Sequence, residues 1–303
     1  MKELVVLSGK GGTGKTSITA SFAHLAGASV IADCDVDAAD LHLVLSPETL
    51  RRETFTSGGE AVIRTEDCIA CGICKDKCRF HAVRKVRLKK HAYAYEIDPL
   101  ACEGCSVCAA LCPEDAIDFP ERSCGEWMVS KTRFGTMVHA RLAIGAENSG
   151  KLVTIVKNEA RRIARQQQCC WILADGPPGI ACPVIASISG ASAALIVVEP
   201  TLSGIHDMER VLELTRHFGI PAFVCVNKWE IHPAMADEIE QNAGRAGARL
   251  VGRIRYDGSV TAAQIRGIPV TEYGGPASED IRGVWGRVAS HMEAVETPER
   301  IVV

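Results

Sequence analysis

The sequence has little that would form a nucleic-acid-binding surface. Only 5% of its 303 residues are aromatic, and its formal net charge is -3. Proteins that hold single strands stack bases on aromatic side chains, and nucleic-acid-binding domains are usually strongly basic. We therefore expect no nucleic acid among the partners.

Long apolar runs are also missing. No segment approaches the roughly 20 consecutive apolar residues that a membrane-spanning helix needs. The segment Ala289–Val303 lacks the basic stripe with which an amphipathic helix binds anionic lipid. No signal peptide is expected, because Lys2–Leu7 already predicts a buried strand. These absences favour a cytoplasmic protein with no direct membrane binding.

Cysteine, in contrast, is abundant, with 14 residues in the chain. Secreted disulfide scaffolds are usually much shorter than this chain. We therefore expect a reducing compartment and cysteines that are metal ligands or free thiols. The hydrophobic content of 47% is enough to bury a sizeable core, in one large domain with or without a small module.

The stretch SGKGGTGKTS contains the phosphate-binding pattern G-x-x-x-x-G-K-[ST]. A predicted strand, Glu3–Leu7, precedes it, and an amphipathic helix is predicted from Lys15 to about Leu25. Glycines let backbone N–H groups surround a phosphate, and the helix N-terminus adds a partial positive charge. The predicted nucleotide-binding residues of this loop are Gly9, Lys10, Gly11, Gly12, Thr13, Gly14, Lys15, Thr16 and Ser17.

Two lysines of this loop have different predicted roles in catalysis. Lys15 is expected to reach the β- and γ-phosphates, and Thr16 to hold Mg²⁺ through its hydroxyl. Lys10 is not needed for a phosphate cradle, but K-G-G-[TV]-G-K-[ST] marks the deviant Walker A loop. With it the chain resembles the MinD/ParA/Mrp group of P-loop ATPases, which includes the nitrogenase iron protein. The resemblance implies an ATP-dependent homodimer, or a heterodimer with a related chain, in which Lys10 contacts the partner's phosphates. The alternative is a solvated loop lysine.

Acidic residues follow the next predicted strand, Ala28–Ala32. They lie where an α/β sheet places its ligands, at the carboxyl end of a strand. The pair Asp33 and Asp35 resembles switch I of the family. The resemblance implies that Asp35 orients or deprotonates the attacking water and that Asp33 contacts Mg²⁺ through water. Hydrated carboxylates with no further role are the alternative.

A third acidic residue, Asp175, follows the apolar stretch Cys170–Ala174. This stretch resembles a Walker B strand, which implies that Asp175 holds Mg²⁺ through water. Gly176–Gly179 resembles switch II, a loop that a γ-phosphate orders, although a simple Pro/Gly turn is possible. Asn227 resembles the asparagine that contacts adenine in this family.

Strands and helices alternate through the rest of the chain. Strands are predicted at Ala194–Val198, at Ala222–Val226 and near Leu250, and helices at Gly204–Phe218 and Pro233–Ala246. This alternation predicts a parallel sheet with helices on both faces. The expected fold is therefore α/β: a doubly wound, mainly parallel P-loop NTPase sheet.

A cysteine-rich segment of different character interrupts this pattern. The run C-x₂-C-x₂-C-x₃-C occurs twice, and the first cysteines of the two runs, 68 and 102, give an offset of 34 residues. The predicted metal ligands are Cys68, Cys71, Cys74, Cys78, Cys102, Cys105, Cys108 and Cys112. The spacing is that of bacterial two-cluster ferredoxins, in which the fourth cysteine of each run binds the other cluster.

The crossed pattern predicts two [4Fe–4S] clusters, one held by residues 68, 71, 74 and 112 and the other by residues 78, 102, 105 and 108. Zinc and structural thiols are the alternatives. We expect the ferredoxin-like α+β module to span residues 60–120, inserted in an ATPase domain of residues 1–59 and 121–303. The chain as a whole resembles MinD-superfamily ATPases with such an insert.

Other features of the sequence lie outside these motifs. The basic stretch Arg84–Lys90 predicts either a solvated hairpin or a docking patch for an acidic redox partner. Cys182 follows Asp175 at the spacing of a bridging-cluster ligand in the nitrogenase iron protein, but the sequence offers no convincing second ligand, and a buried structural role is the alternative. Four other cysteines lie in apolar segments and are predicted to be core residues: Cys34, Cys169, Cys170 and Cys225.

Three functions agree with these features. The first is an ATP-gated electron-transfer protein with an unidentified redox or regulatory partner. The second is an Fe–S carrier of the Mrp type, which the absence of any cysteine after Cys225 disfavours, because those chains have a C-terminal CxxC. The third is a MinD-like spatial regulator that acts through a protein partner.

Overall fold

The computed structural model describes residues 1–87, 93–143, 145–146 and 149–294. It divides into two compact units. The larger unit comprises Met1–Glu53, Glu126–Leu142 and Asn148–Val303, and the smaller unit comprises Thr54–Gly125 and Ala143–Glu147. The smaller unit thus extends beyond the predicted module of residues 60–120 at both ends.

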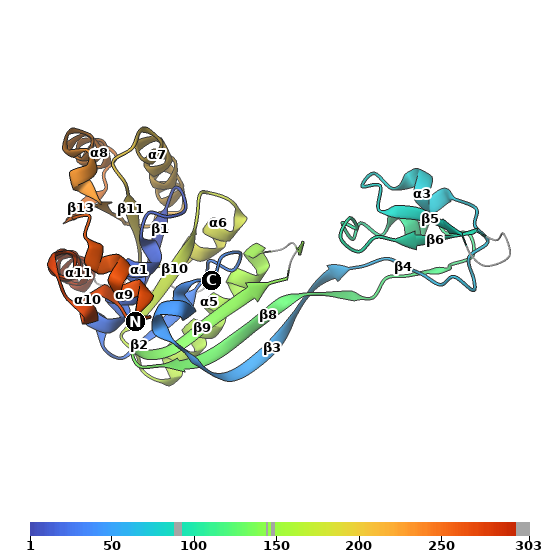
Figure 1. Cartoon of the computed structure of the whole chain (residues 1–303), viewed down its shortest axis with the longest axis horizontal. Helices are drawn as coiled ribbons and strands as arrows, with labels where there is room; N and C mark the ends of the chain where they lie inside the picture. The colour runs from blue at the N-terminus through green and yellow to red at the C-terminus, as the bar shows by residue number, and fades with distance from the viewer. Residues whose placement is uncertain (88–92, 144, 147–148, 295–303) are drawn as a thin grey trace. The chain divides into compact units, whose positions relative to one another are not determined.

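The main sheet has nine strands in the order β13-β12-β11-β1-β10-β2-β9-β8-β3 (Figure 1). The six strands from β13 to β2 and their neighbour β9 pair in parallel. The strand bounds, in chain order, are β1 Lys2–Ser8, β2 Ser29–Asp33, β3 Glu48–Gly59, β8 Glu121–Thr132, β9 Gly135–Leu142, β10 Trp171–Pro178, β11 Ala193–Val198, β12 Ala222–Asn227 and β13 Arg249–Ile254.

Helices cover the sheet (Figure 1). Their bounds are α1 Lys15–Ala26, α2 Leu41–Leu45, α5 Ser149–Gln166, α6 Cys182–Ile188, α7 Leu202–His217, α8 Pro233–Arg245, α9 Gly258–Ile265, α10 Val270–Tyr273 and α11 Pro276–Ala294, with a short 3-10 turn at Trp229–Ile231. The core joins α1 and α11 to alternate strand residues such as Leu4 and Val6. The predicted α/β, mainly parallel P-loop fold is therefore confirmed.

The structure differs from the sequence-based expectation in helix α1, in the length of β10 and in three additional strands. Helix α1 was predicted to be amphipathic, but Lys15 and every residue from Ser17 to Ala23 are buried, because α1 packs between the sheet and other helices. Strand β10 does not end at Ala174 but continues through Asp175 to Pro178, since β1 and β2 flank it on both sides. Strands β3, β8 and β9 were not predicted.

The prediction that Cys169 and Cys170 are core residues is wrong. Cys169 is half-buried and Cys170 is exposed, because both precede the start of β10 at Trp171. Cys34 and Cys225 are fully buried.

The two cysteine runs of the smaller unit have equivalent backbone pairings (Figure 1). In one strand pair Val62 pairs with Asp118 and Ile63 pairs with Ile117. In the other strand pair the residues that lie 34 positions away in the sequence pair in the same way, 96 with 84 and 97 with 83. The sequence repeat is thus a repeat of structure. Its elements are β4 Val62–Ile63, α3 Ile73–Lys77, β5 Val83–Arg87, β6 Tyr93–Ile97, α4 Val107–Ala110 and β7 Ile117–Asp118.

Candidate functional site

The phosphate-binding loop joins β1 to α1 at the carboxyl end of the sheet. Gly14 adopts φ +93°, and a Cβ at this position would lie 2.5 Å from Nδ2 of Asn227. Nδ2 of Asn227 donates to the carbonyl oxygen of Thr13 at 2.7 Å. Only glycine combines this backbone conformation with so close a neighbour. The structure therefore brings Asn227, at the end of β12, against the loop.

The side chains that follow this loop point toward β10. Oγ1 of Thr16 donates to Oδ2 of Asp175 at 2.7 Å, and Oγ1 of Thr19, one turn later, donates to Oδ1 at 3.0 Å. Both carboxylate oxygens of Asp175 are thus held by α1. Lys15 is buried, and its Nζ lies 3.9 Å from Oδ2 of Asp35. The predicted Thr16, Asp175, Lys15 and Asp35 therefore lie in one site.

Asp33 completes an acidic cluster at the ends of β2 and β10. It is fully buried and opposite Asp175 in the strand register. Its Oδ1 accepts from the backbone N–H of Asp35 at 3.2 Å, but its Oδ2 has no hydrogen-bond partner within the described residues. Burial, and then the negative charges of Asp175 and Asp35, raise the pKa of Asp33 well above its usual value.

The same causes act on the other two carboxyl groups. Burial raises the pKa of Asp35 to about 6, although Lys15 opposes the change. Burial also raises the pKa of Asp175. Three buried carboxyl groups whose charges repel one another, one of them with an oxygen that has no partner within the described residues, would be stabilised by a nearby hard cation such as Mg²⁺. The residues present therefore fit the predicted metal.

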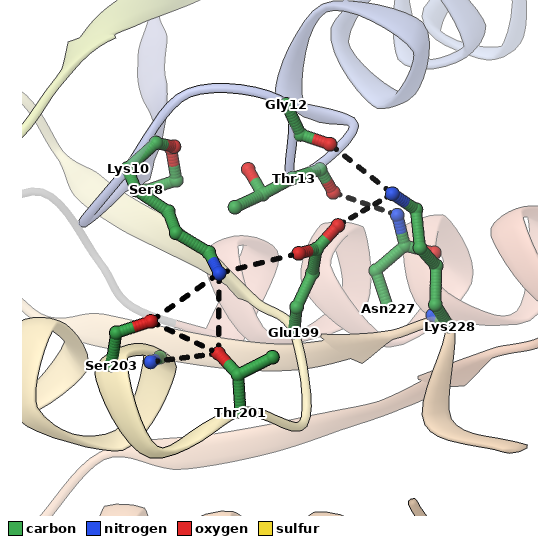
Figure 2. A network of polar contacts seen from close by, with 10 residues as sticks. Ser8, Lys10, Gly12, Thr13, Glu199, Thr201, Ser203, Asn227 and Lys228 are labelled. Carbon is green, nitrogen blue, oxygen red and sulfur yellow. Dashed lines mark hydrogen bonds and ion pairs between the residues drawn. The ribbon is translucent and has the colours of Figure 1, made fainter. Parts of the chain in front are cut away.

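Lys10 is held by the loop that follows β11 (Figure 2). Its Nζ donates to Oγ1 of Thr201 at 3.2 Å and to Oγ of Ser203 at 3.4 Å, and it lies 3.6 Å from Oε2 of Glu199. Glu199 also pairs with Lys228, whose Nζ donates to the carbonyl oxygen of Gly12 at 3.2 Å. Glu199 therefore joins both sides of the phosphate-binding loop.

Beside the loop lies a cavity of about 270 Å³. Ser17 lines it and accepts at Oγ from Nε2 of Gln264 at 2.9 Å. Arg255 also lines it, but its guanidinium group is fixed by a bidentate pair with Asp280, at 2.7 and 2.8 Å. The remaining lining residues are Gly12, Gly14, Ile18, Asn227, Lys228, Ile254, Tyr256, Asp257, Val260, Thr261, Val270 and Ile281.

Sequence reasoning missed several residues of this site. Thr19 could have been found, because it lies about one helical turn after Thr16 on the same face. Glu199, Lys228 and Gln264 carry no local signal, because their distance in sequence from the loop exceeds 180 residues.

The eight predicted cysteine ligands line two cavities of the smaller unit. Cys68, Cys71, Cys74 and Cys112 line one cavity. The other cavity is lined by Cys78, Cys102, Cys105 and Cys108. Each set combines three cysteines of one run with the fourth of the other. In the part of the chain that the structure describes, no group of three or more His, Cys, Asp or Glu residues is arranged to hold a metal ion.

The other sequence features have the following places. Cys182 is exposed at the start of α6, so the buried structural role considered for it is wrong. Cys124, the nearest cysteine upstream that could have been a second ligand, is buried on β8, where its Sγ donates to the carbonyl oxygen of Ser57 at 3.1 Å. Of the basic stretch Arg84–Lys90, residues 88–90 lie outside the described residues, as do residues 295–303 of the C-terminal segment. Among the described helices, none is long and apolar enough to cross a membrane.

Comparison with known proteins agrees with this geometry. Residues 4–270 match the family described as CbiA, the CobQ/CobB/MinD/ParA nucleotide binding domain. Two uncharacterized proteins of Methanocaldococcus jannaschii are similar: MJ0578 is 32% identical over 75% of this chain and 78% of its own length, and MJ0579 is 27% identical over 76% and 81%.

Among solved structures, the cell division ATPase MinD of Pyrococcus furiosus superimposes with a TM-score of 0.58 at 17% sequence identity, over 96% of this chain and 99% of that one. This likeness shows a shared fold. MinD/ParA members of the family are ATPases, in agreement with the P-loop ATPase class predicted from the sequence. The chain therefore belongs to the CobQ/CobB/MinD/ParA nucleotide-binding family.

Proposed function

We propose that this protein binds and hydrolyses Mg–ATP in its larger unit and carries two [4Fe–4S] clusters in its smaller unit. Nucleotide-dependent dimerisation then gates electron transfer, or the docking of a protein partner, through the clusters. The observation that carries this proposal is the sorting of eight cysteines into two cavities of four, in a chain that also has a phosphate-binding loop.

The nucleotide site has the groups that phosphoryl transfer needs. Lys15 lies where it stabilises negative charge on the β- and γ-phosphates. Thr16 holds Mg²⁺ through its hydroxyl, and Asp33 and Asp175 hold it through water, since Mg²⁺ usually keeps several water ligands. Asp35 orients the attacking water and accepts its proton, and a pKa of about 6 suits such a base near neutral pH. Asn227 contacts the adenine.

Lys10 acts in a dimer of this chain, or of this chain with a related one. Its contacts with Glu199, Thr201 and Ser203 lie within one chain. A role at the partner's phosphates requires exchange of these contacts for phosphate oxygens. Facing lysines repel each other, so the γ-phosphate favours closure by balancing their charge. The ATP state then dimerises and the ADP state does not.

The cysteine cavities hold thiols that would need a nearby cation to ionise. Burial raises the pKa of Cys74 to about 11, and the neighbouring thiols Cys68, Cys71 and Cys108 act in the same direction. Burial also raises the pKa of Cys108. Such thiols ionise readily only near positive charge, which iron supplies. Clusters bound there carry single electrons.

A four-iron cluster separates its ligands more widely than a single ion does.

In this proposal residues 60–120 form the ferredoxin-like domain, inserted in an ATPase domain of residues 1–59 and 121–303. We place the protein in the cytoplasm, where thiols stay reduced. Its partner is a redox or regulatory protein, not a nucleic acid or a membrane.

A second candidate is a MinD-like regulator that acts through a protein partner. The family match and the shared fold with the cell division ATPase MinD favour it. The two candidates differ in their metal content, because a spatial regulator has no need of iron.

The deciding experiment is metal and sulfide analysis of anaerobically purified protein, with EPR after reduction. We expect about eight irons per chain and the signals of two [4Fe–4S]⁺ clusters. Cys71→Ser should lower the iron content by about half, whereas Cys170→Ser, an exposed cysteine outside both cavities, should leave it unchanged. Zinc without iron overturns the electron-transfer proposal, and ATPase activity that persists without iron then favours the regulator.

A further inference from the structure

Two ion pairs of the smaller unit occupy equivalent positions with their charges exchanged. Arg64 pairs with Asp118, and Arg84 pairs with Asp98. The 34-residue offset of the cysteine runs relates residue 64 to 98 and residue 84 to 118. Each position is therefore an arginine in the first half of the repeat and an aspartate in the second.

The backbone around the two pairs is the same. The N–H of Arg64 donates to the carbonyl oxygen of Ala116 at 2.8 Å, and the N–H of Asp98 donates to that of Ala82 at 2.7 Å. These two bonds are related by the same 34-residue offset. Since the backbone frames match, the exchange of charge is a property of the side chains alone.

The first pair joins the two segments whose cysteines share one cavity. Arg64 also donates to Oδ2 of Asp67 at 2.7 Å and to the carbonyl oxygen of Asp115 at 2.5 Å. Asp67 directly precedes Cys68, and the N–H of Asp115 donates to the carbonyl oxygen of Cys112 at 3.3 Å. One guanidinium group thus connects the loop of Cys68 with the segment of Cys112.

The second pair joins the segments of the other cavity. Asp98 lies four residues before Cys102, and Arg84 lies six residues after Cys78. The second oxygen of Asp98 accepts from the backbone N–H of Leu100 at 3.0 Å, which fixes the carboxylate at the start of the second run.

Pairing of a half with itself would bring like charges together. The first half would place Arg64 beside Arg84, and the second half would place Asp98 beside Asp118. In the observed register Val62 lies opposite Asp118 and Glu96 lies opposite Arg84, so each ion pair is diagonal across its two strands. Long side chains reach such diagonal neighbours, and repulsion between like charges is a common source of specificity. The observed pairing of one half with the other is the arrangement that makes both pairs attractive.

We propose that the charge-exchanged pairs Arg64–Asp118 and Arg84–Asp98 are positioning residues that direct each half of the repeat to pair with the other half. This pairing brings Cys112 and Cys78 into the cavity of the opposite run. The inference rests on the proposed function, because the crossed cysteine sets are its cluster sites. The side chain of Arg84 is 71% exposed, so the pair selects between arrangements rather than adding much to overall stability.

The test uses the full chain, unfolded and refolded without oxygen in the presence of iron and sulfide. In the observed pairing, Arg84→Asp places a second negative charge beside Asp98. In the alternative pairing of the first half with itself, the same change makes the contact with Arg64 attractive. We expect this variant to recover about four of the about eight irons. The double variant Arg84→Asp/Asp98→Arg should recover more than half of the lost iron. Arg133→Asp, which breaks an ion pair with Glu272 in the larger unit, serves as the matched control and should recover as much iron as the wild type.

A second measurement identifies the cluster that is lost. Cys105→Ser added to Arg84→Asp should remove no further iron, whereas Cys71→Ser should remove the rest. If Arg84→Asp does not refold, Arg84→Gln replaces it, and an iron yield between those of the wild type and Cys105→Ser is expected.

Three outcomes overturn the inference: full iron recovery by Arg84→Asp, or by Arg84→Gln where it replaces that variant; loss without any rescue in the double variant; or equal loss in the Arg133→Asp control. A wild-type protein that takes up no iron overturns the proposed function instead.

Discussion

Replacement of Asp35 by asparagine should stabilise the nucleotide-free protein while it stops ATP hydrolysis. Burial raises the pKa of Asp35 from 3.8 to about 6; Lys15 opposes this change, and the charges of Asp175 and Asp37 add to it. At neutral pH the folded protein therefore holds a carboxylate whose ionisation is unfavourable. Asparagine keeps the shape of the side chain and removes the charge.

The size of the effect follows from linkage. One pKa unit corresponds to about 1.4 kcal/mol, so the difference corresponds to about 3 kcal/mol for a fully buried group. The side chain of Asp35 is 12% exposed, so we expect solvent screening to leave about 1–2 kcal/mol. Because the folded pKa is raised, the folded protein binds the proton more tightly. Wild-type stability then falls as the pH rises from about 4 through about 6, and the full penalty remains above that range.

The assay is urea unfolding of both proteins at pH 5.5 and pH 7.5 without nucleotide. The advantage of Asp35→Asn should be larger at pH 7.5, because asparagine does not titrate. Glu213→Gln, which neutralises an exposed carboxyl group on α7, is the control and should change stability little. In parallel, Asp35→Asn should bind Mg–ATP and turn it over at least about 100-fold more slowly, the usual contribution of a positioned base. A stability advantage of Asp35→Asn over the wild type that is equal at both pH values, or ATP turnover by Asp35→Asn at the wild-type rate, would refute the reasoning.

Three further predictions concern the phosphate-binding loop. Lys15→Ala should lose nucleotide binding, which calorimetry with Mg–ATP would measure, and binding at the wild-type affinity would contradict its role. Lys10→Ala should bind ATP normally but dimerise weakly. The measurement is sedimentation with ATP in the hydrolysis-deficient Asp35→Ala protein, which should show a dimer that the added Lys10→Ala change removes. A sedimentation coefficient that is the same in all these samples would reject the dimer. Gly14→Ala should lower the free energy of unfolding by about 1–3 kcal/mol, because φ is +93° and the new Cβ would meet Asn227; unchanged urea unfolding would contradict this.

Features carried by short sequence patterns could be predicted. The loop from Gly9 to Thr16 specifies its own turn, and its strand and helix follow from local hydrophobicity. Asp33 and Asp175 could be placed together, because each ends a predicted parallel strand and such ends share one edge of a sheet. The spacing of the cysteines, which is that of two-cluster ferredoxins, indicated which cysteines would line the same cavity, because the fourth cysteine of each run belongs to the other cluster in that pattern.

Features that depend on distant contacts could not be predicted. Strand β3 carries many exposed residues, and only five of the twelve residues of β8 are buried, so the hydrophobic pattern of both strands is weak. The contact of Lys10 with Glu199 joins segments 189 residues apart, and nothing in either segment indicates the other. Cys170 was misplaced because an apolar neighbourhood in sequence says nothing about where a strand begins.

The charges of the nucleotide site explain why ATP should enter only with its metal. Lys10, Lys15 and Lys228 lie around the loop, but each already has a carboxylate neighbour or, for Lys228, a carboxylate and a carbonyl oxygen. Triphosphate alone would compete for these lysines while it added negative charge beside Asp33 and Asp175. Mg²⁺ offers those two carboxylates a cation and lowers their pKa values, so the acids that disfavour bare phosphate then favour the metal complex. Under the proposed role of Lys10, its release from Glu199 would be easiest in that state, because phosphate oxygens would replace its lost partner.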